Sequence, residues 1–158
     1  MKLPLNEQDV FQLALTMLSR RSCSEAEVAL QLKRKNVDGA TVMAVISRLR
    51  EYGYLNDAAL CDLLLHKYST SKKYGIRAIV DKLKRRGLPG PVIQNVINSF
   101  DYAGELKKAQ NLIQKYITAK PVSNYEIQTK VARFLYTKGF SQHTINAILE
   151  ELPSAGQE

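Results

Sequence analysis

The sequence predicts an all-α protein built from three tandem three-helix repeats, and three observations favour this fold class. Apolar residues recur at the helical spacing i, i+3, i+4, i+7 in segments 10–18, 42–49, 93–100 and 145–152. No segment sustains the apolar–polar alternation that indicates a half-buried strand. A six-residue motif also recurs at a nearly constant interval, which indicates that one structural unit is repeated along the chain.

Residues that begin helices place the predicted elements in order. Asn6 and Asp38 are of the type preferred at helix N-caps, and Ser141 precedes the last apolar segment. Residues 24–27 read Ser-Glu-Ala-Glu, a capping box in which the serine and the glutamate each accept the other's backbone N–H. Gly-Pro at 90–91 places a proline in a first helical turn, where no N–H is needed. The predicted helices cover residues 7–21, 24–35, 39–51, 56–70, 75–86, 90–101, 103–118, 123–138 and 141–151.

The repeat can be read directly from the sequence. Residues 32–37 match residues 83–88, 51 positions further on, and these match residues 135–140 after another 52 positions. The helix-ending position of this motif, where a left-handed backbone favours glycine and then asparagine, holds Asn36, Gly87 and Gly139. The repeats are predicted to cover residues 6–54, 55–102 and 103–152, with a frayed tail at 153–158.

Each predicted repeat is small. A unit of about 50 residues buries too little apolar surface to be comfortably stable alone. Stacking against a neighbouring repeat supplies the missing burial. We therefore expect an elongated molecule that can be curved, with one face available to a partner.

The charge of the chain is positive and concentrated in its middle. The 158 residues include 23 lysines and arginines against 15 aspartates and glutamates, a formal net charge of +8. Such a balance favours polyanionic partners, although solubility alone also accounts for a basic surface. Between His66 and Gly87 the only acid is Asp81. The cations of that segment are Lys67, Lys72, Lys73, Arg77, Lys82, Lys84, Arg85 and Arg86.

Nine cations are the candidate partner-binding residues. Cations at a helix C-terminus also interact favourably with the helix dipole, which is an alternative explanation for residues 33–35 and 84–86. Arg77 near a helix N-terminus is electrostatically unfavourable, so an external anion explains it better. Tyr68 and Tyr74 lie among the cations, where they either stack on nucleic-acid bases or pack at a helix junction. The candidates are Lys72, Lys73, Arg77, Lys84, Arg85 and Arg86, followed by Lys33, Arg34 and Lys35.

Several function classes are excluded by composition. The chain has two histidines and two cysteines, too few and too scattered for a metal site or a disulfide framework. It contains neither a dinucleotide-binding glycine motif nor a phosphate-binding loop. No apolar run approaches the roughly 18 residues that cross a bilayer, and the N-terminus lacks the apolar stretch of a signal peptide. We expect a cytoplasmic protein that is not an enzyme and has no catalytic residues, no cofactor, no metal and no membrane partner.

Four motifs in order resemble the RecX family of recombinase regulators. The first runs from residue 19 to 32 through the capping box, and the second, at 52–57, reads Tyr-Gly-Tyr-Leu-Asn-Asp. The third combines Tyr-Gly-x-Arg at 74–77 with Leu-Lys-Arg-Arg-Gly-Leu at 83–88, and the fourth spans 130–140. The sequence departs from the family pattern at Asn56, where aspartate is usual, at Leu60, where phenylalanine is common, and at Asn36, where glycine is frequent.

The resemblance implies binding to the filament that the RecA recombinase forms on single-stranded DNA. Family members lie in the filament groove and inhibit ATP hydrolysis, filament growth and strand exchange. We expect the chain to act as a monomer that contacts the single-stranded DNA directly or through the filament. Four residues at the second motif are expected to hold the first repeat against the second, namely Tyr52, Tyr54, Leu55 and Asp57.

Two alternatives remain open from the sequence. One is a basic helical module that binds DNA or RNA directly, without a recombinase; its affinity for naked DNA would fall steeply with salt. The other is a helical-repeat adaptor for an unrelated protein, which would show no dependence on nucleic acid.

Overall fold

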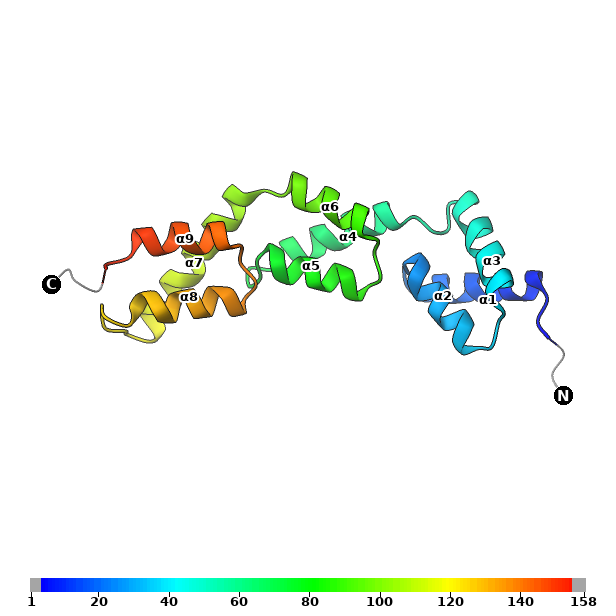
Figure 1. Ribbon diagram of the computed structural model, residues 1–158, viewed down its shortest axis with the longest axis horizontal. Coiled ribbons are helices and arrows are strands. Elements are labelled where there is room, and N and C mark those ends of the chain that lie inside the picture. Colours follow the sequence, from blue (N-terminus) through cyan, green and yellow to red (C-terminus); the bar gives the residue numbers. More distant parts are fainter. Residues whose placement is uncertain (1–3, 155–158) are drawn as a thin grey trace. The chain divides into compact units, whose positions relative to one another are not determined.

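The computed structural model describes residues 4–154, and within that range every regular element is an α-helix (Figure 1). The all-α prediction is confirmed. The helices are α1 (Glu7–Arg20), α2 (Glu25–Arg34), α3 (Gly39–Glu51), α4 (Asp57–Ser69), α5 (Ile76–Arg85), α6 (Gly90–Ser99), α7 (Tyr102–Ala119), α8 (Ile127–Thr137) and α9 (Gln142–Glu151).

One predicted helix begins four residues later than expected. The eighth helix was placed at 123–138, but α8 begins at Ile127. The carbonyl of Ser123 accepts the backbone N–H groups of both Glu126 and Ile127, which closes a turn before the helix. Part of the predicted frayed tail, residues 155–158, lies outside the described residues.

The predicted caps are present. The side chains of Asn6, Asp38 and Ser141 each accept the backbone N–H three residues ahead. Ser24 and Glu27 form both hydrogen bonds of the capping box. The helix-ending positions of the repeat are left-handed as predicted, with φ of 63° at Asn36, 74° at Gly87 and 80° at Gly139.

The chain divides into two compact units. Of the described residues, unit 1 contains 4–64 and 83–94, and unit 2 contains 65–82 and 95–154. Helices α4, α5 and α6 each contribute to both units. The predicted repeat boundaries at 54/55 and 102/103 stay a prediction.

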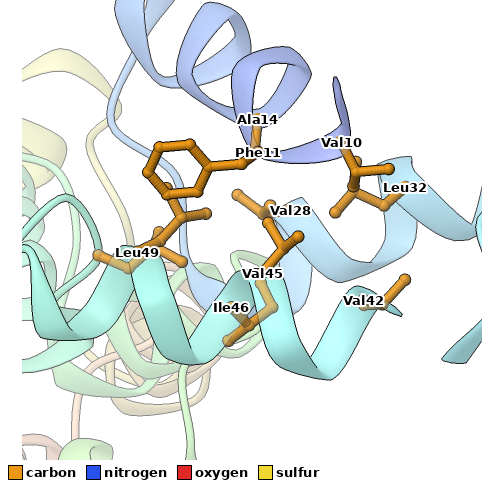
Figure 2. Close-up of a cluster of buried hydrophobic side chains, with 10 residues drawn as sticks. Val10, Phe11, Ala14, Val28, Leu32, Val42, Val45, Ile46 and Leu49 are labelled. Carbon is orange, nitrogen blue, oxygen red and sulfur yellow. The ribbon is translucent and has the colours of Figure 1, made fainter. Parts of the chain in front are cut away.

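Unit 1 is built around an apolar cluster contributed by α1, α2 and α3 and by Leu55, which follows α3. The labelled side chains of the three helices point toward one another in Figure 2. Each fully buried leucine or valine there contributes about 2 kcal/mol relative to an exposed position. The cluster consists of Val10, Phe11, Ala14, Val28, Leu32, Val42, Val45, Ile46, Leu49 and Leu55.

The expectation for the second motif is only partly met. Leu55 is 2% exposed within the core of unit 1, and Asp57 accepts the backbone N–H of Glu25 at 3.0 Å. Tyr52 and Tyr54, however, are 66% and 54% exposed. Their rings lie edge-to-face with the ring of Phe11, at centroid distances of 6.0 and 6.5 Å. Because more than half of each tyrosine side chain is exposed, neither is buried in an interface between repeats.

Unit 2 has an equivalent core formed by α7, α8 and α9. Phe140, the largest of its fully buried side chains, follows α8 directly after the left-handed Gly139. Tyr116 and Phe134 stack beside this core at a centroid distance of 4.6 Å. The buried cluster consists of Ala109, Ile113, Ile127, Val131, Leu135, Phe140, Ile145 and Ile148.

Candidate functional site

The nine predicted binding cations lie at helix ends and in one loop. Arg86 is half-buried, and the other eight are exposed. Unit 1 contains residues 33–35 at the end of α2 and residues 84–86 at the end of α5. Unit 2 contains Lys72 and Lys73 in the loop after α4, and Arg77 at the start of α5.

The Arg86 side chain makes its contacts within the protein. Its Nε lies 3.0 Å from Oε1 of Glu27, and its Nη2 donates to the carbonyl of Ser22 at 2.9 Å. The two side chains are 20% and 19% exposed, so the ion pair is largely removed from water. Arg21 also pairs with Glu27, on the other carboxylate oxygen. Arg86 therefore attaches the end of α5 to the beginning of α2 and differs from its exposed neighbours Lys84 and Arg85.

The backbone reinforces this attachment. The buried Ser24 hydroxyl donates to the carbonyl of Arg86 at 2.5 Å while it accepts the N–H of Glu27 at 3.1 Å. Gly87 lies directly on α2, because a Cβ at this position would come within 2.8 Å of the Cβ of Ala26. The C-terminal end of α5 is thereby held against the N-terminal end of α2.

Unit 2 contains the same type of junction between α8 and α5. The Lys138 carbonyl accepts the N–H of Gly75 at 3.1 Å, and the Gly139 carbonyl accepts the N–H of Arg77 at 2.8 Å. These bonds satisfy N–H groups that a helix start leaves without intrahelical partners. Gly139 lies on Ala78 as Gly87 lies on Ala26. The repeat is therefore visible in tertiary contacts as well as in sequence.

The cations of unit 1 do not form one patch. Arg86 is bound at the first turn of α2, whereas residues 33–35 are at its other end. Ten helical residues span about 15 Å, so the two groups are separated by the length of the helix. Lys33, Arg34 and Lys35 are exposed there, beside the negative end of the helix dipole.

The tyrosines among the cations pack on them. The guanidinium of Arg77 lies 4.1 Å from the ring centroid of Tyr136. The ammonium of Lys82 lies 4.5 Å from the ring of Tyr74 and 5.0 Å from that of Tyr68. Of the two sequence interpretations, packing at a helix junction describes Tyr68 and Tyr74. Stacking occupies only the face of the Arg77 guanidinium, and its in-plane N–H groups can still meet an anion.

Sequence reasoning missed Lys108. Its Nζ donates to the carbonyl of Ser69, at the end of α4, and to that of Tyr74 at 3.1 and 3.2 Å. Burial lowers the pKa of Lys108, and the nearby Glu105 opposes that shift. The two bonds bracket the loop that carries Lys72 and Lys73 and tie it to α7. No local pattern in the sequence distinguishes Lys108 from a solvated lysine.

Glu105 is a second residue that the sequence did not indicate. Its side chain is 2% exposed, and Oε1 accepts the backbone N–H of Ser141 at 2.7 Å. Burial raises the pKa of the Glu105 carboxyl, and hydrogen bonds from Ser141 and Thr144 oppose this. Its Oε2 is buried without a hydrogen-bond partner among the described residues. The Glu105 carboxylate therefore accepts an N–H at the start of α9, but its negative charge is poorly solvated there.

The raised pKa of Glu105 predicts a pH-dependent stability. A carboxyl whose pKa in the folded state lies above its ordinary value of 4.5 contributes stability below that value and loses it as the pH rises through the folded pKa. We therefore expect the free energy of unfolding of the wild type, relative to that of Glu105→Gln, to fall as the pH rises from acid to neutral, as measured by urea denaturation at a series of pH values. The comparison is the difference between wild type and variant, in which the other carboxyls cancel. A difference that stays constant from acid to neutral pH would contradict this explanation.

The described residues contain no group of three or more potential metal ligands. In residues 4–154, none of the helices combines the length and apolar character needed to cross a bilayer.

Comparison with known proteins identifies the family. The model "RecX, first three-helix domain" matches residues 11–49, and the model "RecX, third three-helix domain" matches residues 104–149. The chain belongs to the RecX family. Both matched segments coincide with three-helix groups of the structure, α1–α3 and α7–α9, so tandem three-helix repeats are confirmed.

Individual RecX relatives extend over most of this chain. A regulatory protein RecX of Bacillus velezensis is 30% identical over 142 residues, 89% of this chain and 54% of its own length. One from Caldanaerobacter subterraneus is 31% identical over 136 residues, 86% of this chain and 66% of its own length. The chain spans about half the length of the Bacillus relatives it matches. The crystal structure of RecX from Lactobacillus salivarius has the same fold, with a TM-score of 0.84 at 21% identity, covering 92% of this chain and 96% of that one.

Proposed function

We propose that the chain regulates the RecA recombinase by binding its filament on single-stranded DNA. Bound in the filament groove as a cytoplasmic monomer, it restrains ATP hydrolysis, filament growth and strand exchange. Membership of the RecX family supports this function, because the curated relatives bear the name regulatory protein RecX. The observation that carries the proposal is the presence of exposed cations at the ends of well-anchored helices, which suits binding to a large anionic surface.

The proposed mechanism is steric and electrostatic. Arg86, Ser24 and Gly87 anchor the end of α5, so Lys84 and Arg85 project from a rigid support. A rigid basic surface held against neighbouring recombinase protomers would resist the movement between them that ATP turnover requires. Regulation by occupancy of this kind needs no catalytic group from the chain.

Charge reversal at the end of α5 tests the proposed function. We expect Lys84→Glu/Arg85→Glu to raise at least tenfold the concentration needed to inhibit recombinase ATPase on single-stranded DNA, because both side chains are exposed and available to the partner. Substitutions of exposed residues usually change stability by less than about 0.5 kcal/mol, so the thermal midpoint should stay close to wild type. Lys130→Glu/Arg133→Glu on α8 makes the same change in net charge and is the control. Wild-type protein that leaves the ATPase unchanged at stoichiometric amounts would overturn the function itself.

A further inference from the structure

A groove runs along α7 within unit 2. Its volume is about 780 Å³, and its walls come from α7 and from the loop after α4. Four lysines line it, namely Lys72, Lys107, Lys108 and Lys115, and no lining residue is acidic. Lys107, Lys108 and Lys115 were not among the binding candidates that the sequence indicated.

The lysines are spread along the groove. Lys107 and Lys115 are exposed and eight residues apart on α7, which places their Cα atoms about 12 Å apart along the helix axis. A site for one phosphate instead directs its donors at a single point. Lys72 adds a charge from the opposite, loop side. The arrangement therefore fits an extended polyanion better than a single small anion.

Lys108 gives the groove its shape and is a positioning residue. Because its Nζ donates to the carbonyls of Ser69 and Tyr74, it holds the loop between them against α7. Lys72 is part of that loop and is thereby kept at the groove. An ammonium has three N–H groups, and these two bonds use two of them. The two walls of the groove, α7 and the loop after α4, are therefore held together by hydrogen bonds within the fold.

The other lining groups distinguish between two kinds of polyanion. Leu112 and Ala119 supply apolar surface, and Asn111 and Gln114 supply amide groups beside the lysines. Single-stranded nucleic acid presents phosphates, sugars and the apolar faces of unstacked bases together. An acidic peptide could also pair with the lysines. Its carboxylates, however, bind most strongly to the forked guanidinium of arginine, and no arginine lines the groove.

We propose that this groove binds the backbone of single-stranded nucleic acid without regard to sequence. The inference rests on the proposed function, in which single-stranded DNA is part of the target, and adds a direct contact to it. Lys72, Lys107 and Lys115 contact phosphates, and Lys108 positions the loop. Such contacts weaken with salt, by about 0.7 in the slope of log K against log salt for each phosphate contact to a single strand.

Binding of fluorescently labelled oligo(dT) to the purified chain, followed by anisotropy at several salt concentrations, tests this groove. We expect Lys107→Glu/Lys115→Glu to weaken binding at least tenfold and to reduce the salt slope by about 1.4, the value for two lost contacts. Lys130→Glu/Arg133→Glu, which has the same net charge but lies outside the groove, should change affinity less than threefold. If the reversal lowers the thermal midpoint, Lys107→Gln/Lys115→Gln provides the same comparison with less repulsion.

Three results would contradict binding in this groove. Equal losses of affinity in both charge-reversed variants would mean that only net charge matters, and no loss in either would mean that the groove lysines do not contact the oligonucleotide. Displacement of the oligonucleotide by polyglutamate as effectively as by unlabelled oligo(dT) would assign the groove to an acidic protein surface.

Recombinase ATPase, measured with the same proteins, separates this proposal from the proposed function. A wild type that binds oligo(dT) through the groove but leaves ATPase unchanged disproves the proposed function alone. Inhibition by a groove variant that binds oligo(dT) like wild type disproves the groove alone.

Discussion

Gly75→Ala is expected to lower the free energy of unfolding by about 3 kcal/mol or more, among the largest effects of a single methyl group. A Cβ at this position would lie 2.3 Å from Cα of Phe140 and 2.7 Å from the Gly139 carbonyl oxygen. These are backbone atoms, so no side-chain rotation relieves the clash. Phe140 is fully buried, and any shift of its backbone moves a ring out of the core of unit 2. The substitution would also weaken the bond from the Gly75 N–H to the Lys138 carbonyl.

Gly39→Ala is the matched control. No atom outside its own neighbourhood lies within 4 Å of a Cβ placed at Gly39, which begins α3. Alanine is favoured over glycine in a helix by up to about 1 kcal/mol, so this variant should be neutral or slightly more stable. Urea denaturation followed by circular dichroism compares the two. Equal stability of both variants would mean that the α8–α5 junction does not hold unit 2 together.

Arg86→Glu is the second substitution with a large expected effect, a loss of about 3 kcal/mol. It places a carboxylate beside Glu27, whose side chain is 19% exposed, and removes the donor to the Ser22 carbonyl. Breaking a largely buried ion pair is costly, and the cation that then remains beside Glu27, Arg21, is 62% exposed. The attachment of α5 to α2 would weaken, although the Ser24 bond to the Arg86 carbonyl involves only the backbone at residue 86.

The adjacent Arg85→Glu makes the same charge change on an exposed side chain. We expect it to alter the free energy of unfolding by less than about 0.5 kcal/mol. Thermal and urea denaturation of the two variants, run side by side, give the comparison. If both variants keep wild-type stability, Arg86 is a surface cation like its neighbour, and its ion pair contributes nothing to the fold.

Local features of the sequence were sufficient to predict the helices. A cap such as Ser24 and a left-handed position such as Gly87 act within a few residues, so their effect can be read without the tertiary structure. The threefold repeat could be predicted for the same reason, because each copy carries its own helical periodicity of apolar residues. The late start of α8 at Ile127 was missed because Ser123, the residue type of a cap, closes a turn instead.

The candidate site was less predictable because its contacts are distant in sequence. Counting charges grouped Arg86 with Lys84 and Arg85, but its partner Glu27 lies 59 positions away. Lys108 bonds to carbonyls 39 and 34 positions away. The groove had one local signal, since Lys108 and Lys115 are seven residues apart and therefore share a helix face. That signal does not reveal which lysine binds the backbone and which remains exposed.

Co-sedimentation with recombinase filaments tests the central claim most directly. The chain is incubated at one moderate salt concentration either with RecA-coated single-stranded DNA or with the same DNA uncoated, and the bound fraction is measured after centrifugation. We predict that the chain pellets with the coated DNA at a concentration where the naked DNA retains much less. Equal retention on both, or retention on naked DNA alone, would contradict filament recognition and assign the chain to direct nucleic-acid binding.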